Sequence, residues 1–172
     1  DYYSADYCRK VGDIVRAMRR IQNVRFFSYT RCWTNEAFRI EMARIAELSV
    51  ATGSRPRVAI RVNPDFELKT SGMKMGGSPK PFGVDAERVP VMLAQLGTLP
   101  LDFIGFHIFS GSQNLRPEAI IEAQTKTFRL AFRLAEAAPR PVRWLNIGGA
   151  LGVPYFPGEQ RVELAAIAAN LE

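Results

Sequence analysis

Apolar positions recur along this chain with two different spacings, which predict helices and strands in turn. Phe38, Met42, Ile45 and Leu48 follow one another at three- and four-residue steps, a spacing that places them on one face of a helix. Short apolar runs bounded by glycine, proline or polar residues are typical of buried strands. On this basis we predict helices over residues 35–52, 85–97, 117–138 and 162–171, and strands over 58–62, 101–108 and 142–147.

Three further patterns complete the prediction of secondary structure. Residues 1–22 carry apolar positions at helical spacing, and residues 24–29 have the β-branched and aromatic character of a strand. Residues 67–83 are polar and glycine-rich, which predicts a long loop with either a functional role or none. On the longest predicted helix, one face is marked by Ile121, Thr125, Phe128, Phe132 and Ala135.

The order of these elements indicates the class of fold. Strands with few polar residues alternate with helices, which is the pattern of a parallel α/β sheet or barrel. Each predicted strand ends in a polar or glycine cluster. In parallel α/β folds the carboxyl ends of the strands share one edge, and ligands bind there. We therefore expect the clusters to converge into one site with a cation, hydroxyls and glycines: Arg61 with Asn63, Ser110–Gln113, and Asn146 with Gly148-Gly149.

The glycine cluster suggests a particular ligand. The apolar run 142–147 stops at Gly148 and Gly149, whose backbone N–H groups can approach an anion closely because glycine has no Cβ. A plain strand-to-loop turn explains this segment alone equally well. Its place after a third parallel strand, beside Ser112 and Arg61, favours an anion cradle, with a phosphate as the natural guest.

The arginine within the run 58–62 has two interpretations. A buried guanidinium needs a partner, whereas an arginine at a strand edge can reach solvent. The run alone slightly favours the second interpretation for Arg61.

Composition narrows the classes of function. The net charge is +6, but the arginines are scattered and follow no aromatic pattern, so we do not expect nucleic-acid binding. Gly72 and Gly77 have the spacing of a Walker A loop, yet Ser78-Pro79 stands where its lysine belongs, so that interpretation is rejected. No run of 18 apolar residues is present, and we expect neither a membrane span nor a signal peptide.

The cysteines and the histidine limit metal and redox chemistry. Cys8 and Cys32 lack metal-site spacing and suggest free thiols in a reducing compartment, which predicts a cytoplasmic protein. The single histidine, His107, makes a histidine-rich metal site impossible. We therefore assign no metal ligand in this chain.

Four segments, in this order, resemble the fold-type III pyridoxal-phosphate decarboxylases, which include the diaminopimelate and ornithine decarboxylases. The segments are Arg61–Pro64, Lys80–Gly83, His107–Gln113 and Asn146–Tyr155. The sequences of residues 63–69 and 73–77 are most similar to those of the exosortase-associated branch of the family. The resemblance covers residues 40–172 and not residues 1–39. We therefore predict an unmatched N-terminal segment, 1–39, followed by part of a pyridoxal-phosphate-binding barrel domain, 40–172.

The resemblance implies a fold and a set of roles. The fold is a parallel (β/α)8 TIM barrel of the alanine racemase-like kind, here incomplete, with pyridoxal 5'-phosphate at its C-terminal face. Gly148, Gly149 and Ala150 would cradle the phosphate of the cofactor through their N–H groups. Ser112 would hydrogen-bond near the phosphate, and Arg61 would lie near the pyridoxal ring.

The residue that stacks on the ring depends on the alignment. Aligning Gly111-Ser112-Gln113 with the family places Phe109 at the stacking position. Aligning Phe106-His107 instead makes His107 the stacking residue and Ser110 the hydroxyl. We prefer the first because the match is longer, and a phenyl ring can offer its π-face. Taken without the family, His107 is an ordinary core histidine.

The chain also departs from the family. The Schiff-base lysine belongs to a motif resembling Tyr-Ala-Val-Lys, which is absent here, and Lys10 stands in a different setting. In the family an acidic residue pairs with the pyridine nitrogen of the cofactor, and its position would lie after Glu172. The family's C-terminal β-domain, which contributes a cysteine, is not matched either. We therefore assign no catalytic residue in this chain.

Two functions follow from these expectations. The first is part of the pyridoxal-phosphate-binding barrel of an amino-acid decarboxylase, which removes the α-carboxylate of an amino acid, a small-molecule substrate, as CO2. The full-length protein is expected to be a homodimer, and this part alone to be inactive. The alternative is a non-catalytic module that binds a phosphate ligand.

Overall fold

The computed structural model describes two compact units, Asp1–Thr30 and Arg31–Glu172. In the first unit it describes Asp13 and Ala17, which are both helical, as the helix predicted over residues 1–22 requires. The strand predicted over residues 24–29 lies outside the described residues. The residues that the structure describes are 13, 17, 35–66, 73–74, 83–149 and 151–172.

Helices and parallel strands alternate through the second unit, as the sequence predicts. The helices are α2 (Asn35–Thr52), α3 (Val89–Gly97), α4 (Pro117–Ala135) and α5 (Leu164–Ala169), with a 3₁₀ turn, η1 (Ala86–Arg88), before α3. The strands are β1 (Arg57–Asn63), β2 (Met73–Lys74), β3 (Val84–Asp85), β4 (Asp102–Ile108), β5 (Gly111–Ser112) and β6 (Trp144–Asn146).

The main sheet is parallel throughout the described part of the chain. Its order is β3-β1-β4-β6, so β1, β4 and β6 are neighbours joined through the helices α3 and α4. Residues Arg61 and His107 are partners in the register between β1 and β4, and His107 and Asn146 between β4 and β6. The carboxyl ends of the three strands therefore meet at one edge, which confirms the expected arrangement.

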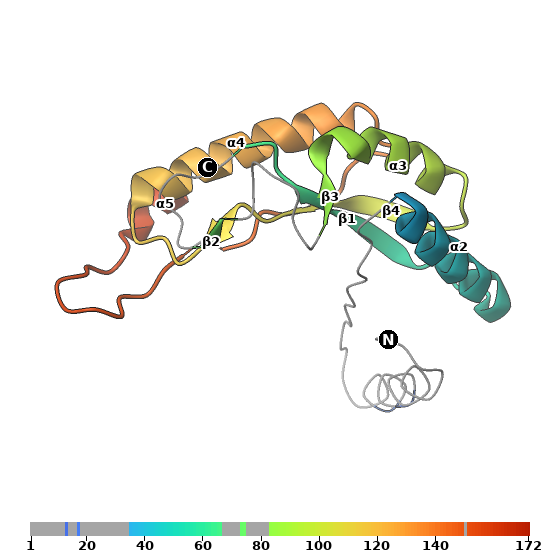
Figure 1. Cartoon of the computed structure of the whole chain (residues 1–172), viewed down its shortest axis with the longest axis horizontal. Helices are drawn as coiled ribbons and strands as arrows, with labels where there is room; N and C mark the ends of the chain where they lie inside the picture. Colours follow the sequence, from blue (N-terminus) through green and yellow to red (C-terminus); the bar gives the residue numbers. More distant parts are fainter. Residues whose placement is uncertain (1–12, 14–16, 18–34, 67–72, 75–82, 150) are drawn as a thin grey trace. The chain divides into compact units, whose positions relative to one another are not determined.

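The helices cover one face of this sheet. In Figure 1, α3 and α4 both lie along the upper face, with β1 and β4 beneath them. Phe103 and Phe106 of β4 are completely buried under the helices, with ring centroids 5.4 Å apart in an edge-to-face arrangement. Burial of each such side chain is worth roughly 1.5–3 kcal/mol. The core also contains Met42, Ile60, Val62, Val89, Met92, Leu93, Leu96, Ile108, Leu130 and Leu134.

The other face of the sheet carries the polar side chains. Ile60 and Val62 of β1 are buried against the helices, whereas Arg61 between them is partly exposed. In β4, Phe106 and Ile108 are buried and His107 is partly exposed. Because successive side chains of a strand point to opposite faces, Arg61 and His107 lie on the face away from the helices.

Gly105 brings β4 and β6 into unusually close contact. A Cβ at this position would lie 1.7 Å from the carbonyl oxygen of Trp144. The pairing of β1 with β4 also changes register next to it, between Val58 and Ala59. Only glycine can occupy this position while β6 keeps its place.

The buried face of α4 differs from the predicted one. Ile120, Ala123, Thr127, Leu130 and Leu134 are buried, together with Gln124 and Ala131. The predicted face is wrong, as Phe132, one of its members, is 75% exposed. Apolar residues occupy more than half of the circumference of this helix. Which of them are buried therefore depends on how the helix packs against the sheet.

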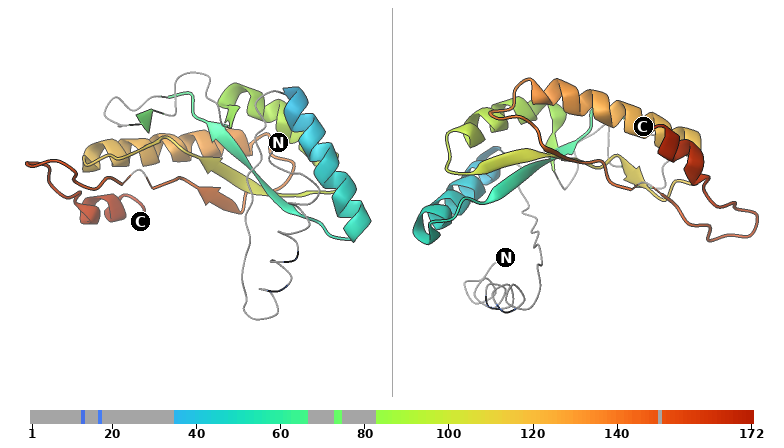
Figure 2. Two further views of the ribbon diagram at one scale, coloured as in Figure 1. Left: turned by 60° about the horizontal axis from the view of Figure 1, so that its bottom comes forward. Right: turned by 180° about the vertical axis from the view of Figure 1, so that it is seen from behind.

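The ends of the predicted elements also shift slightly. β6 is shorter than the predicted strand over 142–147, and α4 ends three residues before position 138, at Ala135. The strands β2, β3 and β5 have two residues each and were not predicted, because so short a pairing leaves no periodic pattern. Figure 2 shows from two further sides the extended segment that separates β6 from α5. No described helix is long and apolar enough to cross a membrane.

Replacing Gly105 with alanine tests the close contact of β4 and β6. We expect the free energy of unfolding to fall by about 3 kcal/mol or more, because the added methyl meets backbone that a rotamer change cannot move. Chemical denaturation followed by circular dichroism measures this. The control is Gly149→Ala, whose Cβ would meet nothing within 4 Å. Equal stability of the two variants would contradict the contact.

Candidate functional site

A row of polar side chains crosses the uncovered face of the sheet near its carboxyl edge. Arg61, His107 and Asn146 are successive partners in the registers of β1, β4 and β6. Paired residues on neighbouring strands point to the same face. The row therefore places a cation, an imidazole and an amide side by side where parallel α/β folds bind ligands.

Arg61 contacts the segment that follows β4. Its guanidinium carbon lies 5.5 Å from the centroid of the Phe109 ring, within the range of a cation–π interaction. β1 is paired on both sides, with β3 and with β4, so Arg61 is not on an edge strand. The edge position expected from the sequence is therefore wrong, while the Arg61 side chain is partly exposed.

Phe109 also contacts the glycine segment that follows β6. A Cβ built on Gly148 would lie 3.0 Å from Cδ2 of Phe109. The phenyl ring thus touches Gly148 and lies close to Arg61, so it joins residues from all three strand ends. This cluster is the convergence that the sequence predicts.

His107 lies beside Arg61 and is held in its neutral form. Burial lowers the pKa of His107 below its ordinary value, and the positive charge of Arg61 lowers it further. A neutral imidazole has one donor and one acceptor nitrogen and can take part in hydrogen bonding on both sides. Whether His107 or Phe109 stacks on a bound ring stays a prediction.

The glycine segment forms a tight turn closed by its own neighbour. The N–H of Gly148 donates to Oδ1 of Asn146 at 2.8 Å, and Gly148 has a left-handed φ of +71°. In this conformation the Gly148 N–H already has an acceptor. The space around Gly149 is open, since a Cβ there would meet nothing within 4 Å. Ala150 lies outside the described residues.

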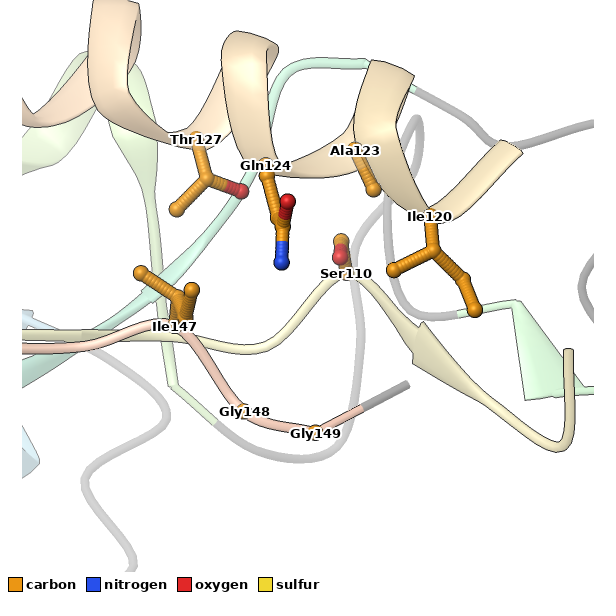
Figure 3. A pocket seen from close by; sticks show the side chains of 8 residues that line it. All are labelled: Ser110, Ile120, Ala123, Gln124, Thr127, Ile147, Gly148 and Gly149. Atoms are coloured by element: carbon orange, nitrogen blue, oxygen red, sulfur yellow. The ribbon is translucent and has the colours of Figure 1, made fainter. Parts of the chain in front are cut away.

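A pocket lies between this turn and helix α4. Its empty space is about 240 Å³, part of it open to solvent. Figure 3 shows the turn along its lower side and α4 along its upper side. The lining residues are Ser110, Ile120, Ala123, Gln124, Thr127, Ile147, Gly148 and Gly149.

The serine in this pocket is Ser110. Ser112 lies two residues further along, in β5, which pairs antiparallel with β2 through Met73. Ser112 does not line the pocket, so its predicted role beside a phosphate stays a prediction. Ser110 is the hydroxyl that the second alignment favoured.

Sequence reasoning missed the contribution of α4 to this pocket. Gln124 and Thr127 are polar residues on the buried face of a helix that is otherwise apolar there. These two residues can be recognised in the sequence as buried polar residues only when the buried face of the helix is known. Because the sequence analysis assigned the wrong face to this helix, it missed them.

The loops after β4 and β6 are tied together beside the pocket. The side-chain amide of Gln113 accepts from the N–H of Val153 at 3.2 Å and donates to its carbonyl at 3.4 Å. The N–H of Gly152 donates to the carbonyl of Asn114 at 2.8 Å. Gln113 adopts a left-handed φ of 55°, which is uncommon for a residue with a side chain. These bonds fix the loop just beyond the glycine turn.

The pocket fits a phosphate group. Thr127 places a fully buried hydroxyl oxygen there that has no hydrogen-bond partner among the described residues. Ser110 and Gly149 line the same space, and no carboxylate lines it. Within the described part of the chain, no cluster of histidine, cysteine and acidic residues could hold a metal ion.

A family model matches almost the whole chain. It is described as the pyridoxal-dependent decarboxylase, pyridoxal binding domain, and it covers residues 5–172. The match extends over most of the segment 1–39 that the sequence analysis leaves unmatched. The boundary at residue 40 stays a prediction.

Curated relatives are decarboxylases. An L-glutamyl-[BtrI acyl-carrier protein] decarboxylase of Niallia circulans is 35% identical over 132 residues, which are 76% of this chain and 31% of the relative. A diaminopimelate decarboxylase of Aquifex aeolicus is 33% identical over 73% of this chain and 30% of its own length. The chain thus spans about a third of the length of these relatives.

Solved structures of the same kind share the fold. The diaminopimelate decarboxylase of Helicobacter pylori, complexed with L-lysine, aligns with a TM-score of 0.62 and 28% identity over 77% of this chain and 35% of that one. The enzyme of Methanocaldococcus jannaschii aligns with a TM-score of 0.62 and 26% identity over 77% of this chain and 32% of that one. The predicted fold, part of an alanine racemase-like TIM barrel, is confirmed.

The lowered pKa of His107 predicts how stability depends on pH. The unfolded chain binds a proton at this imidazole more readily than the folded chain, so the free energy of unfolding falls as pH drops below about 6.5. We expect this loss to be much smaller in His107→Gln, because His107 is the only histidine in the chain. Urea titrations at several pH values between about 5 and 8 measure the effect. Parallel profiles for the two proteins would contradict it.

Proposed function

The chain belongs to the pyridoxal-dependent decarboxylases, as their pyridoxal-binding domain, and from this we propose that it holds pyridoxal phosphate for decarboxylation of an amino acid. Pyridoxal phosphate is the cofactor of this family. The observation that carries the proposal is the contact of Phe109 with both Arg61 and Gly148 at the carboxyl edge of the sheet. That contact joins a ring platform, a cation and a glycine turn in one place.

The chemistry and the binding have different sources. When bound, the cofactor supplies an electron sink for the charge that departing CO2 leaves on the substrate. In this proposal Ser110 and the N–H of Gly149 hold the phosphate, which their place in the lining of the pocket supports. Phe109 offers a ring face for stacking, and Arg61 both supports that ring and adds positive charge beside it.

His107 has a separate task in this proposal. As a neutral imidazole beside Arg61, it adds no second positive charge to the row. The positive charge beside the ring platform is then that of Arg61, 5.5 Å from the centroid of the Phe109 ring. A negatively charged ring oxygen or substrate carboxylate would be drawn to that side of the site.

The substrate is proposed from the relatives. Several of them are diaminopimelate decarboxylases, and one solved relative is complexed with L-lysine, which supports an amino acid as the substrate. The narrower assignment to the exosortase-associated branch stays a proposal based on residues 63–69 and 73–77. We also propose a homodimer as the full-length assembly and a cytoplasmic location.

We also propose that these 172 residues alone bind the cofactor reversibly and release no CO2. The matched segments provide groups for the phosphate and the ring, but the sequence lacks the motif resembling Tyr-Ala-Val-Lys that carries the Schiff-base lysine in the family. The expectation concerns the isolated chain and not the protein to which it belongs.

Titration with pyridoxal phosphate tests the proposed function. We expect a saturable change in absorbance, competition by inorganic phosphate, and weaker binding of pyridoxal because it lacks the phosphate. After borohydride treatment and dialysis, mass spectrometry should find no pyridoxyl group on Lys126 or any other lysine. A stoichiometric adduct at one lysine would overturn the reversible mode, and failure of pyridoxal phosphate to bind would overturn the function.

The same titration separates a decarboxylase domain from a general phosphate-binding module. Such a module binds inorganic phosphate and pyridoxal phosphate about equally. The proposed function requires the pyridoxal ring to add affinity through Phe109. We expect Phe109→Ala to weaken the binding of pyridoxal phosphate about tenfold, which is the scale of one aromatic stacking contact. The affinity for inorganic phosphate should not change.

A further inference from the structure

Helix α4 supplies the upper side of the pocket that faces the glycine turn. Gln124 is 9% exposed and Thr127 is 1% exposed, yet both line the pocket. Their neighbours on the same face are Ile120 and Ala123, which offer no polar atom. Two buried polar side chains at one place on an apolar helix face need a partner, because burying an unsatisfied polar group is costly.

The orientation of Gln124 is fixed from outside the pocket. Its Oε1 accepts from Nδ2 of Asn170 at 3.0 Å, at the end of α5. The amide therefore turns its Nε2, a donor, in another direction. Figure 3 shows this nitrogen pointing down toward the glycine turn and Ser110.

Thr127 adds a second donor from the next turn of the helix. Its hydroxyl oxygen is buried and has no hydrogen-bond partner among the residues that the structure describes. In Figure 3 the oxygen lies on the side of Thr127 that faces Gln124. Both groups can thus donate to one acceptor in the pocket.

The groups around this pocket suit an anion with several oxygens. Ser110, which is 5% exposed, lines the pocket opposite the helix. Its hydroxyl is a third buried donor, after the amide of Gln124 and the hydroxyl of Thr127. No acidic side chain lines the space. A tetrahedral oxyanion can accept from donors on opposite walls at once.

We propose that Gln124 and Thr127 of α4 donate hydrogen bonds to the phosphate of the bound cofactor, with Asn170 as a positioning residue that aims the Gln124 amide. The proposal rests on the proposed function, because it names the phosphate of pyridoxal phosphate as the acceptor. It adds a helical side to a phosphate site otherwise made of a glycine turn and a serine. It also links that site to α5.

Affinity measurements on Gln124→Leu test the donor role. We expect pyridoxal phosphate to bind about tenfold more weakly or worse, because a hydrogen bond to a charged group is lost. Pyridoxal, which has no phosphate, should bind as it does to the wild type. The matched control is Gln95→Leu, since Gln95 is a glutamine on α3 with a buried oxygen and lies outside the pocket. This control should change neither affinity.

The variant Asn170→Asp tests the positioning role. An aspartate only accepts hydrogen bonds, so it should turn the Gln124 amide and aim Oε1 at the phosphate. We expect a loss similar to that of Gln124→Leu, and no additional loss when the two changes are combined. Additive losses would show that Asn170 acts through something other than Gln124.

The outcomes distinguish this proposal from the function on which it rests. If Gln124→Leu loses affinity for pyridoxal phosphate and pyridoxal equally, or loses affinity for neither, the donor role is overturned while the function stays intact. If the wild type binds inorganic phosphate but not pyridoxal phosphate, and Gln124→Leu weakens that binding, the function fails and the donor role stands. If the wild type binds neither, both are overturned.

Discussion

The parallel register of β1, β4 and β6 is the constraint on which the site depends. It places Arg61, His107 and Asn146 in one row and brings the three following segments to one edge. Gly105 is part of this constraint, because the carbonyl of Trp144 occupies the space where a side chain would begin. A shift of β6 by one residue would turn Asn146 to the helical face and move the glycine turn away from Phe109.

The two faces of the sheet have separate tasks. The helical face holds the molecule together through Phe103, Phe106 and the buried residues of α3 and α4. The uncovered face carries the groups that can meet a ligand. The pocket beside α4 lies at the boundary between them, so the helix that closes the core also offers Gln124 and Thr127 to the site. Stability and binding thus share α4.

Much of this arrangement could be predicted from the sequence, because strands and helices leave periodic patterns. The positions of β1, β4, α2 and α4, and the meeting of the strand ends, follow from local pattern and the geometry of parallel sheets. The buried face of α4 could not be predicted, because its apolar residues surround most of the helix and only packing selects among them. Nor could the sequence show that Ser110 lines the pocket while Ser112 lies in β5, because that depends on how the chain turns after β4.

The hydrogen bond from Gly148 to Asn146 gives the glycine turn a stand-in for its ligand. The amide oxygen of Asn146 accepts from the N–H that the sequence analysis assigned to a phosphate, so a side chain of the protein itself holds the turn. A phosphate that reached Gly148 would exchange one acceptor for another and would not have to order a loose loop. Loading this site would then cost little conformational entropy, and its selectivity would depend on how much better a charged oxygen is than a neutral one.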